Sequence, residues 1–242
     1  MNIFELDRKG LLALDPAKVT ELLTPSEFVY IAGKLGAFWS YDHEAARAGR
    51  AGLHPVLKSG LHSDGFFVSR VLLEPPNILK IMAYQMFLRL HQAGVFLTKI
   101  SWVVGVPDGA TSLGREIAKL IGAEVARMDK INGRIMLGTE VGFGNLLIVE
   151  DVFTRGTGFC EAVTEIRAKA PQLSIIPFDP VLLNRGGMKG FGEFTVVPIA
   201  EHRINDWQPE DCPLCRKYFS GTIRPKVSDE NWNALRVSQL PR

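Results

Sequence analysis

Short, mainly apolar runs alternate with longer segments of helical apolar spacing along most of the 242-residue chain. The apolar runs, bounded by turn residues, predict strands at 99–104, 124–128, 146–149, 181–183 and 194–199. Apolar positions at helical spacing predict helices at about 25–35, 42–50, 76–94, 111–121 and 159–170. Strands that are apolar on both faces are typical of parallel sheets covered by helices. The pattern therefore predicts an α/β fold.

One long connection interrupts this alternation. Residues 129–145 are polar and rich in glycine, and they show no clear period. A structureless connection of this length within a compact domain is usually functional or mobile. We therefore predict a functional loop here.

Composition and charge narrow the function. With 46% hydrophobic residues, the chain can bury a substantial core as one domain with extensions. The net charge of +2, without a long basic run, indicates no nucleic-acid surface, and no apolar stretch is long enough to cross a membrane. Charges near the N-terminus argue against export, and three cysteines cannot form a disulfide framework. We predict a cytoplasmic protein.

The most informative stretch follows the strand predicted at 146–149. Two carboxylates, Glu150 and Asp151, come directly after the strand, and a helical period begins at Phe159. Between them lie small residues that allow positive φ and expose backbone N–H groups, namely Thr154, Gly156, Thr157 and Gly158. Because the N-terminus of a helix offers free N–H donors and a positive dipole, this order predicts a phosphate site.

Carboxylates beside a phosphate site suit only some ligands. They repel phosphate, but they suit sugar hydroxyls or a hydrated Mg²⁺. A ligand with a phosphate, ribose hydroxyls and a metal-bound diphosphate satisfies both halves of the motif. The alternative is an ordinary strand-to-helix turn in which Thr157 caps the helix.

This stretch resembles the phosphoribosyl-pyrophosphate motif of the type I phosphoribosyltransferases, and its Glu-Asp order resembles the orotate phosphoribosyltransferase branch. Arg155 stands where that family usually has a small residue. The resemblance implies a mainly parallel twisted sheet with helices on both faces. It also implies N-terminal helices and a small hood at 1–70, a phosphoribosyltransferase core at 71–200 and a C-terminal extension at 201–242.

A second stretch, 53–70, is similar to the orotate phosphoribosyltransferase segment in which Lys-Ser-Gly precedes a serine and two aromatics. The matching residues are Lys58, Ser59, Gly60, Ser63, Phe66 and Phe67. The resemblance implies that Lys58 reaches the diphosphate or the base, and that Phe66 or Phe67 stacks on the base. The alternative is a surface hairpin with one of these rings in the core.

Three further positions match the family. The loop containing Asp108 and Gly109 corresponds to its pyrophosphate loop. Residues 129–145 correspond to its catalytic loop, where Arg127 and Lys130 supply basic groups but Met128 replaces an expected basic residue. Arg185, after the strand at 181–183, corresponds to an arginine that contacts orotate.

The resemblance implies transfer of a 5-phosphoribosyl group from its pyrophosphate to a base, with orotate expected. Residues 154–158 would hold the 5′-phosphate, and Glu150 and Asp151 would hold the ribose hydroxyls. Lys58, Arg127, Lys130 and a Mg²⁺ bound through the diphosphate would neutralise the leaving group. We expect a homodimer. Two alternatives remain, a non-catalytic sensor of the donor or of a nucleotide, and transfer to a different base.

The C-terminal stretch lies outside the resemblance. Cys212 and Cys215 form a C-x-x-C pair, which supplies half of a tetrahedral zinc site. His202 and Cys160 are candidates for the remaining ligands. The pair is thus either a structural turn or part of a structural zinc site, in an arm expected to pack on the body or on a second subunit.

Overall fold

The computed structural model describes residues 2–226 and 228–241 and divides the chain into two units. The first unit contains the chain up to Leu35 together with Ser69–Arg203, and the second contains Gly36–Val68 and the chain from Ile204 onward. These bounds differ from the expected ones. The N-terminal helices belong with the sheet, and the expected hood and the C-terminal extension fold together.

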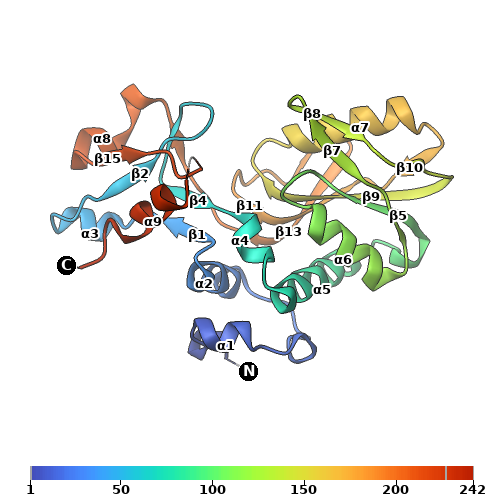
Figure 1. Ribbon diagram of the computed structural model, residues 1–242, viewed down its shortest axis with the longest axis horizontal. Helices are drawn as coiled ribbons and strands as arrows, with labels where there is room; N and C mark the ends of the chain where they lie inside the picture. The colour runs from blue at the N-terminus through green and yellow to red at the C-terminus, as the bar shows by residue number, and fades with distance from the viewer. Residues whose placement is uncertain (1, 227, 242) are drawn as a thin grey trace. The chain divides into compact units, whose positions relative to one another are not determined.

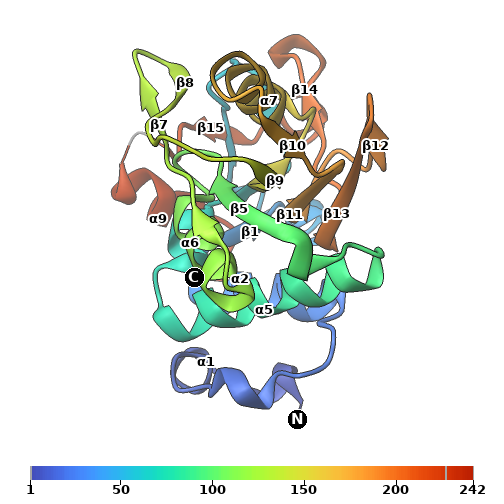
Figure 2. The ribbon, with the colours of Figure 1, turned by 90° about the vertical axis from the view of Figure 1, so that its right-hand side faces the viewer.

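A seven-stranded sheet forms the centre of the first unit, in the order β12-β13-β11-β9-β5-β6 with β10 beside β9 (Figures 1 and 2). Only β12 is antiparallel to its neighbour, which confirms the predicted mainly parallel sheet. The strands are β5 (Ile100–Gly105), β6 (Glu124–Val125), β9 (Gly144–Phe153), β10 (Leu173–Ile175), β11 (Phe178–Asn184), β12 (Gly190–Phe191) and β13 (Phe194–Glu201).

Strand β11 begins three residues before the predicted strand and includes Pro180. A proline cannot donate a ladder hydrogen bond and is rare in a central strand. It is tolerated here because β11 pairs with β9 only from Val181 onward. Pro177 separates β10 from β11, so both strands pair with β9 at different heights.

Helices cover both faces of this sheet. Helix α7 (Thr157–Lys169) lies on one face, and α5 (Pro76–Gln92) and α6 (Thr111–Ile121) lie on the other (Figure 1). The remaining helices of the unit are η1 (Ile3–Glu5), α1 (Arg8–Leu12), η2 (Pro16–Lys18), α2 (Pro25–Leu35), α4 (Ser69–Leu73) and η3 (Leu97–Lys99). The apolar stripes predicted from the sequence face the core, since Ile78, Met82, Phe159 and Ile166 are buried.

Residues 129–145 are not one structureless loop, because a hairpin forms their first part. Strands β7 (Met128–Ile131) and β8 (Arg134–Leu137) form an antiparallel hairpin. Asn132 and Gly133 both have positive φ, 50° and 83°, as a two-residue turn of the type favoured in hairpins requires. Backbone N–H groups of β8 donate to Glu161 and Glu165, so the hairpin is anchored on α7.

The second unit consists of three small two-stranded sheets. In two of them a strand of Gly36–Val68 pairs with a strand from the C-terminal segment. The pairs are β1 (Phe38–Ser40) with β4 (Gly65–Phe67), β2 (Leu53–Pro55) with β15 (Gly221–Ile223), and β3 (His62–Ser63) with β14 (Asp206–Trp207). Its helices are α3 (His43–Arg47), η4 (Pro209–Asp211), α8 (Pro213–Tyr218) and α9 (Asp229–Val237). The C-terminal stretch is therefore an integral part of this unit.

The core of the second unit is aromatic and draws on both segments. Trp39 and Phe66 from the first segment pack with Leu214, Trp232 and Leu235 from the second. The indole N–H of Trp232 donates to the carbonyl of Gly36 at 3.0 Å, which satisfies its buried polar group.

In the described part of the chain, every helix is too short or too polar to cross a bilayer.

Candidate active site

The acidic pair lies inside a strand and not in the loop after it. β9 continues through Glu150 and Asp151 to Phe153, because β11 pairs with this end of β9. Successive side chains of a strand point to opposite faces of the sheet. Glu150 and Asp151 therefore face different surroundings, although they are adjacent in sequence.

Asp151 lies where three segments of the first unit meet. The Ser69 hydroxyl, at the start of α4, donates a short hydrogen bond to the Asp151 carboxylate. A Cβ atom on residue 109 would lie 2.0 Å from Asp151 Oδ2, so the loop after β5 approaches this carboxylate through Gly109. The predicted pyrophosphate loop, with the exposed Asp108, is thus brought beside the predicted ribose carboxylate.

Glu150 points to the α7 face and is only 7% exposed. Burial, together with nearby Asp179 and Asp151, raises the pKa of Glu150 from 4.5 to about 9, and a hydrogen bond from the Phe159 backbone opposes this rise. Burial likewise raises the pKa of Asp179 to about 8. Both shifts favour the protonated form of these buried carboxyls.

The predicted phosphate loop joins this strand to α7. Gly156, with φ of 69°, occupies the N-cap position and supplies no side-chain cap to the helix. A side chain on residue 156 would also meet the Phe153 ring at 3.0 Å. Thr157 does not cap α7, so the N–H groups of Thr157 and Gly158 remain available to an anion, whereas that of Phe159 bonds to Glu150. Arg155 and Thr157 are exposed at this helix end.

Arg185 follows β11 and lies next to the same loop. Its backbone N–H donates to the carbonyl of Phe153 at 3.0 Å, and a Cβ on residue 186 would lie 2.4 Å from the carbonyl oxygen of Thr154. The structure thus brings the predicted base-binding position beside the predicted phosphate loop.

The basic residues of the predicted catalytic loop lie at the hairpin. Arg127 and Lys130 are exposed, and Arg127 Nε lies 3.1 Å from Asp129 Oδ2. An exposed ion pair of this kind contributes about 0–1 kcal/mol and leaves the arginine able to exchange partners. Met128 is 2% exposed and packs in the core with Phe159 and Ile166. Its position in the core explains why it is apolar.

The remaining predicted site residues lie in the second unit. Lys58 is exposed in the turn between β2 and β3. Phe66 is 5% exposed and packs against Trp232, so its ring belongs to the core, as in the alternative interpretation of this segment. Phe67 is partly exposed, and it remains the candidate for stacking on a base.

Two residues of the site were missed by sequence reasoning. Ser69 carries no sequence pattern that marks a carboxylate partner. Asp179 did offer a clue, because a carboxylate within an apolar run is rarely buried without a reason.

A cavity of about 370 Å³ between η2, α5 and α6 includes none of the predicted site residues among its lining.

Comparisons with known proteins bear on the fold and on the sequence of the whole chain. No protein-family model matches the chain. The crystal structure of orotate phosphoribosyltransferase from Aeropyrum pernix superposes with a TM-score of 0.55 at 20% identity, covering 72% of this chain and 93% of that one. The first unit therefore has the fold of the type I phosphoribosyltransferases.

Sequence relatives point to one branch of that class. The chain is 26% identical over 188 residues to orotate phosphoribosyltransferase from Nitratiruptor sp., covering 71% of this chain and 90% of the relative. It is 27% identical over 199 residues to the enzyme of the same name from Pelotomaculum thermopropionicum, covering 81% of this chain and 94% of that relative. The chain is thus a relative of the orotate phosphoribosyltransferases.

Proposed function

We propose that this protein transfers the 5-phosphoribosyl group of phosphoribosyl pyrophosphate to orotate and releases pyrophosphate. The observation that carries the proposal is the position of Asp151. Its carboxylate lies between Ser69 and Gly109, at the end of the strand that leads into the uncapped N-terminus of α7. One ligand with a phosphate, a ribose and a diphosphate fits this sequence of groups.

The 5′-phosphate would bind the loop formed by residues 154–158. The N–H groups of Thr157 and Gly158 would donate to it, the dipole of α7 favours an anion there, and Arg155 adds a positive charge. Because the pKa of Glu150 is raised to about 9, this neighbouring carboxyl adds little negative charge beside the phosphate. The apparent conflict between acid and phosphate in the sequence is thereby resolved.

The ribose hydroxyls would bind to Asp151. A partly exposed carboxylate accepts hydrogen bonds from two adjacent hydroxyls and stabilises the positive charge that develops at the anomeric carbon. Ser69 holds this carboxylate in one orientation. Glu150 would serve chiefly as a buried support on the α7 side of the strand.

The diphosphate would lie over the loop at Asp108 and Gly109, with the exposed side chains of Arg127 and Lys130 as cations. The hard carboxylate oxygens of Asp108 and Asp151 suit a Mg²⁺ held mainly by the diphosphate, which neutralises the leaving group when bound. Closing basic side chains over the donor would keep water from the reacting carbon.

Orotate is the proposed acceptor because the base would lie near Arg185. A guanidinium offers two parallel donors to the orotate carboxylate, and such charge-assisted pairs are stronger than neutral hydrogen bonds. We further propose a homodimeric, cytoplasmic enzyme of pyrimidine biosynthesis.

A non-catalytic sensor of the donor is the second candidate. Buried Met128 favours it, because the hairpin then supplies fewer cations for a leaving group than the resemblance implies. Transfer to a base other than orotate is a further possibility. Pyrophosphate release measured with orotate, uracil, adenine, guanine and hypoxanthine separates the three. Turnover with orotate is expected, whereas tight donor binding without turnover would favour the sensor.

Replacement of Arg185 tests the base assignment. Arg185→Ala should lower kcat/KM for orotate by roughly 2–4 kcal/mol in transition-state terms, since one partner of a charged pair is lost. Donor affinity, measured by calorimetry, should change little. Arg115→Ala, which removes an exposed arginine on α6, is the control. Equal losses for orotate and for any second base would assign Arg185 a structural role.

A further inference from the structure

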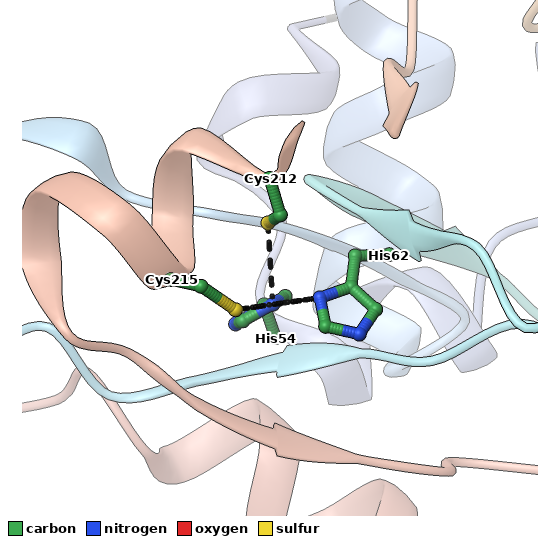
Figure 3. A group of neighbouring side chains, drawn as sticks. All are labelled: His54, His62, Cys212 and Cys215. Atoms are coloured by element: carbon green, nitrogen blue, oxygen red, sulfur yellow. Dashed lines mark hydrogen bonds between the residues drawn. The ribbon is translucent and has the colours of Figure 1, made fainter. Parts of the chain in front are cut away.

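Four side chains of the second unit converge on one point. His54 lies on β2 and His62 on β3, while Cys212 and Cys215 flank the first turn of α8. Figure 3 shows the two imidazole rings and the two thiols directed toward a common centre. One potential ligand atom from each residue lies within 4.8 Å of every other.

The distances match a tetrahedral metal site. His54 Nε2 lies 3.0 Å from His62 Nδ1 and 3.5 Å from each sulfur, and Cys215 Sγ lies 3.4 Å from His62 Nδ1. Four ligands around zinc at normal bond lengths would be separated by about 3.3 Å for two nitrogens and about 3.6 Å for nitrogen and sulfur. The nitrogens therefore need to separate by only a few tenths of an ångström.

Hydrogen bonding alone cannot account for this arrangement. His54 Nε2 has three neighbours within 3.5 Å, two sulfurs and an imidazole nitrogen, but a neutral imidazole nitrogen carries at most one hydrogen. His54 and Cys212 are fully buried and His62 is 8% exposed, so water is largely excluded from the cluster. A cation coordinated by all four atoms accepts one lone pair from each of them and so gives every one a partner.

We propose that His54, His62, Cys212 and Cys215 bind one Zn²⁺ in a closed structural site. Two thiolates and two imidazoles in tetrahedral arrangement favour zinc over magnesium or calcium, which prefer oxygen ligands. With four protein ligands, no position is left for substrate, so the metal is structural. The proposal does not depend on the proposed transferase activity.

This assignment replaces the ligands expected from the sequence. Cys160 is exposed on α7, and His202 follows β13, so both belong to the first unit. The C-x-x-C pair is completed instead by two histidines 150 or more positions earlier in the chain. A redox role for the pair would need an accessible attacking sulfur, whereas Cys212 is fully buried.

The site also has a structural consequence. Zinc would join the two segments of a unit of only about 70 residues, a size at which a single core is often insufficient and a metal supplies the missing stability. The two histidines lie on either side of the turn that carries Lys58, and the Leu57 N–H donates to the Leu61 carbonyl across its base at 2.8 Å. The metal would thus fix the base of this turn.

Metal analysis of the full-length protein tests the proposal. Protein purified without chelators from zinc-supplemented cells should contain about one zinc per chain, because the site is four-coordinate. His54→Ala and Cys215→Ser should each lose most of this zinc. Cys160→Ser, which removes the exposed thiol outside the cluster, should keep all of it.

A second measurement on the unmutated protein covers the case in which these variants fail to fold. Replacement of zinc by Co²⁺ should give thiolate-to-cobalt charge-transfer bands and the intense visible bands of tetrahedral cobalt. Unmutated protein without metal, with Cys212 and Cys215 as free thiols or as a disulfide by mass spectrometry, would overturn the proposal. So would an octahedral cobalt spectrum, or zinc retained by both cluster variants.

Discussion

Two neighbouring carboxyl groups of β9 have different chemistry because the strand directs them to opposite faces. Asp151 meets a hydroxyl and a glycine at a partly exposed surface, whereas Glu150 is buried beside α7 and Asp179. Burial raises the pKa of Glu150, which favours the neutral form of this carboxyl beside the phosphate loop. The phosphate loop can therefore lie beside an acid without repulsion, and the ribose can meet a carboxylate.

Asp151→Asn tests the assigned role of the exposed acid. The amide keeps the size of the carboxylate and can still accept the Ser69 hydrogen bond, so the fold should be retained. Loss of the negative charge should lower kcat for pyrophosphate release by roughly 100-fold, the scale for removing one oriented electrostatic group. Glu193→Gln, which breaks an exposed ion pair with Arg167, is a matched control with normal turnover. Unchanged donor affinity and turnover in Asp151→Asn would refute the assignment.

Asp179→Asn should change how stability depends on pH. Because burial raises the pKa of Asp179 from 3.8 to about 8, the folded state binds a proton that the unfolded state releases between these values. Stability from this group is therefore present at low pH and falls as pH rises through that window. The variant carries a neutral amide, so its stability should not show this fall. The difference in free energy of unfolding, variant minus unmutated protein, should therefore be about 1–3 kcal/mol larger at pH 9 than at pH 5.

Urea unfolding at a series of pH values provides this measurement. Glu140→Gln, at an exposed position, should leave the pH dependence of the unmutated protein in place. The same slope in Asp179→Asn as in the unmutated protein would show that Asp179 is not the buried proton-binding group.

At the scale of single residues, the sequence pattern identified those candidate site residues that are neighbours along the chain. Glu150, Asp151 and the loop at 154–158 were predictable because strand end, loop and helix start are continuous in sequence. Ser69 and Asp179 come from other segments, and only the packing of α4 and β11 brings them to β9. Phe66 and Met128 could not be assigned correctly without knowing which side chains face a core.

At the scale of elements, the hairpin β7–β8 is the main departure from prediction. The Asn132–Gly133 pair is a strong hairpin pattern, but the polar composition around it obscured the alternation of buried Met128 and Ile135 with exposed neighbours. The hairpin carries Lys130 and adjoins Arg127, so its stability should affect access to these cations.

Gly133→Ala should destabilise the hairpin locally. At φ of 83° an alanine is strained by about 1 kcal/mol, although the surrounding space is open. Amide hydrogen exchange should therefore quicken across β7 and β8 and remain unchanged in β9. Gly33→Ala is the matched control, because residue 33 lies in α2 with open space and no positive φ, and alanine should stabilise that helix by about 0.5–1 kcal/mol. Unchanged exchange in the hairpin of Gly133→Ala would show that the turn does not limit its stability.

At the scale of the whole molecule, the second unit could not be predicted from local pattern. Its strands are two or three residues long, and two of its three strand pairs join segments at opposite ends of the sequence. Strands this short show no period of apolar and polar residues from which they could be predicted. The C-x-x-C pair was visible, but its histidine partners became apparent only once β2 and β3 were placed beside α8.

Removal of the proposed zinc should unfold the second unit before the first. Of the four tryptophans, Trp39, Trp207 and Trp232 belong to the second unit and only Trp102 to the first, so tryptophan fluorescence reports mainly on the second unit. Far-UV circular dichroism is dominated by the long helices of the first unit. A chelator should lower the stability seen by fluorescence by at least about 3 kcal/mol, the linkage expected when a tightly bound ion is lost.

The two probes then separate the effects of the metal on the two units. Urea transitions followed by fluorescence should shift to lower urea concentration after chelation and return when zinc is restored. Mg²⁺ should not restore them, because a site of nitrogen and sulfur ligands disfavours this ion. The circular dichroism transition of α5, α6 and α7 should move far less. Coincident transitions that do not respond to the chelator would show that the second unit is held by its aromatic core alone, around Trp39 and Trp232.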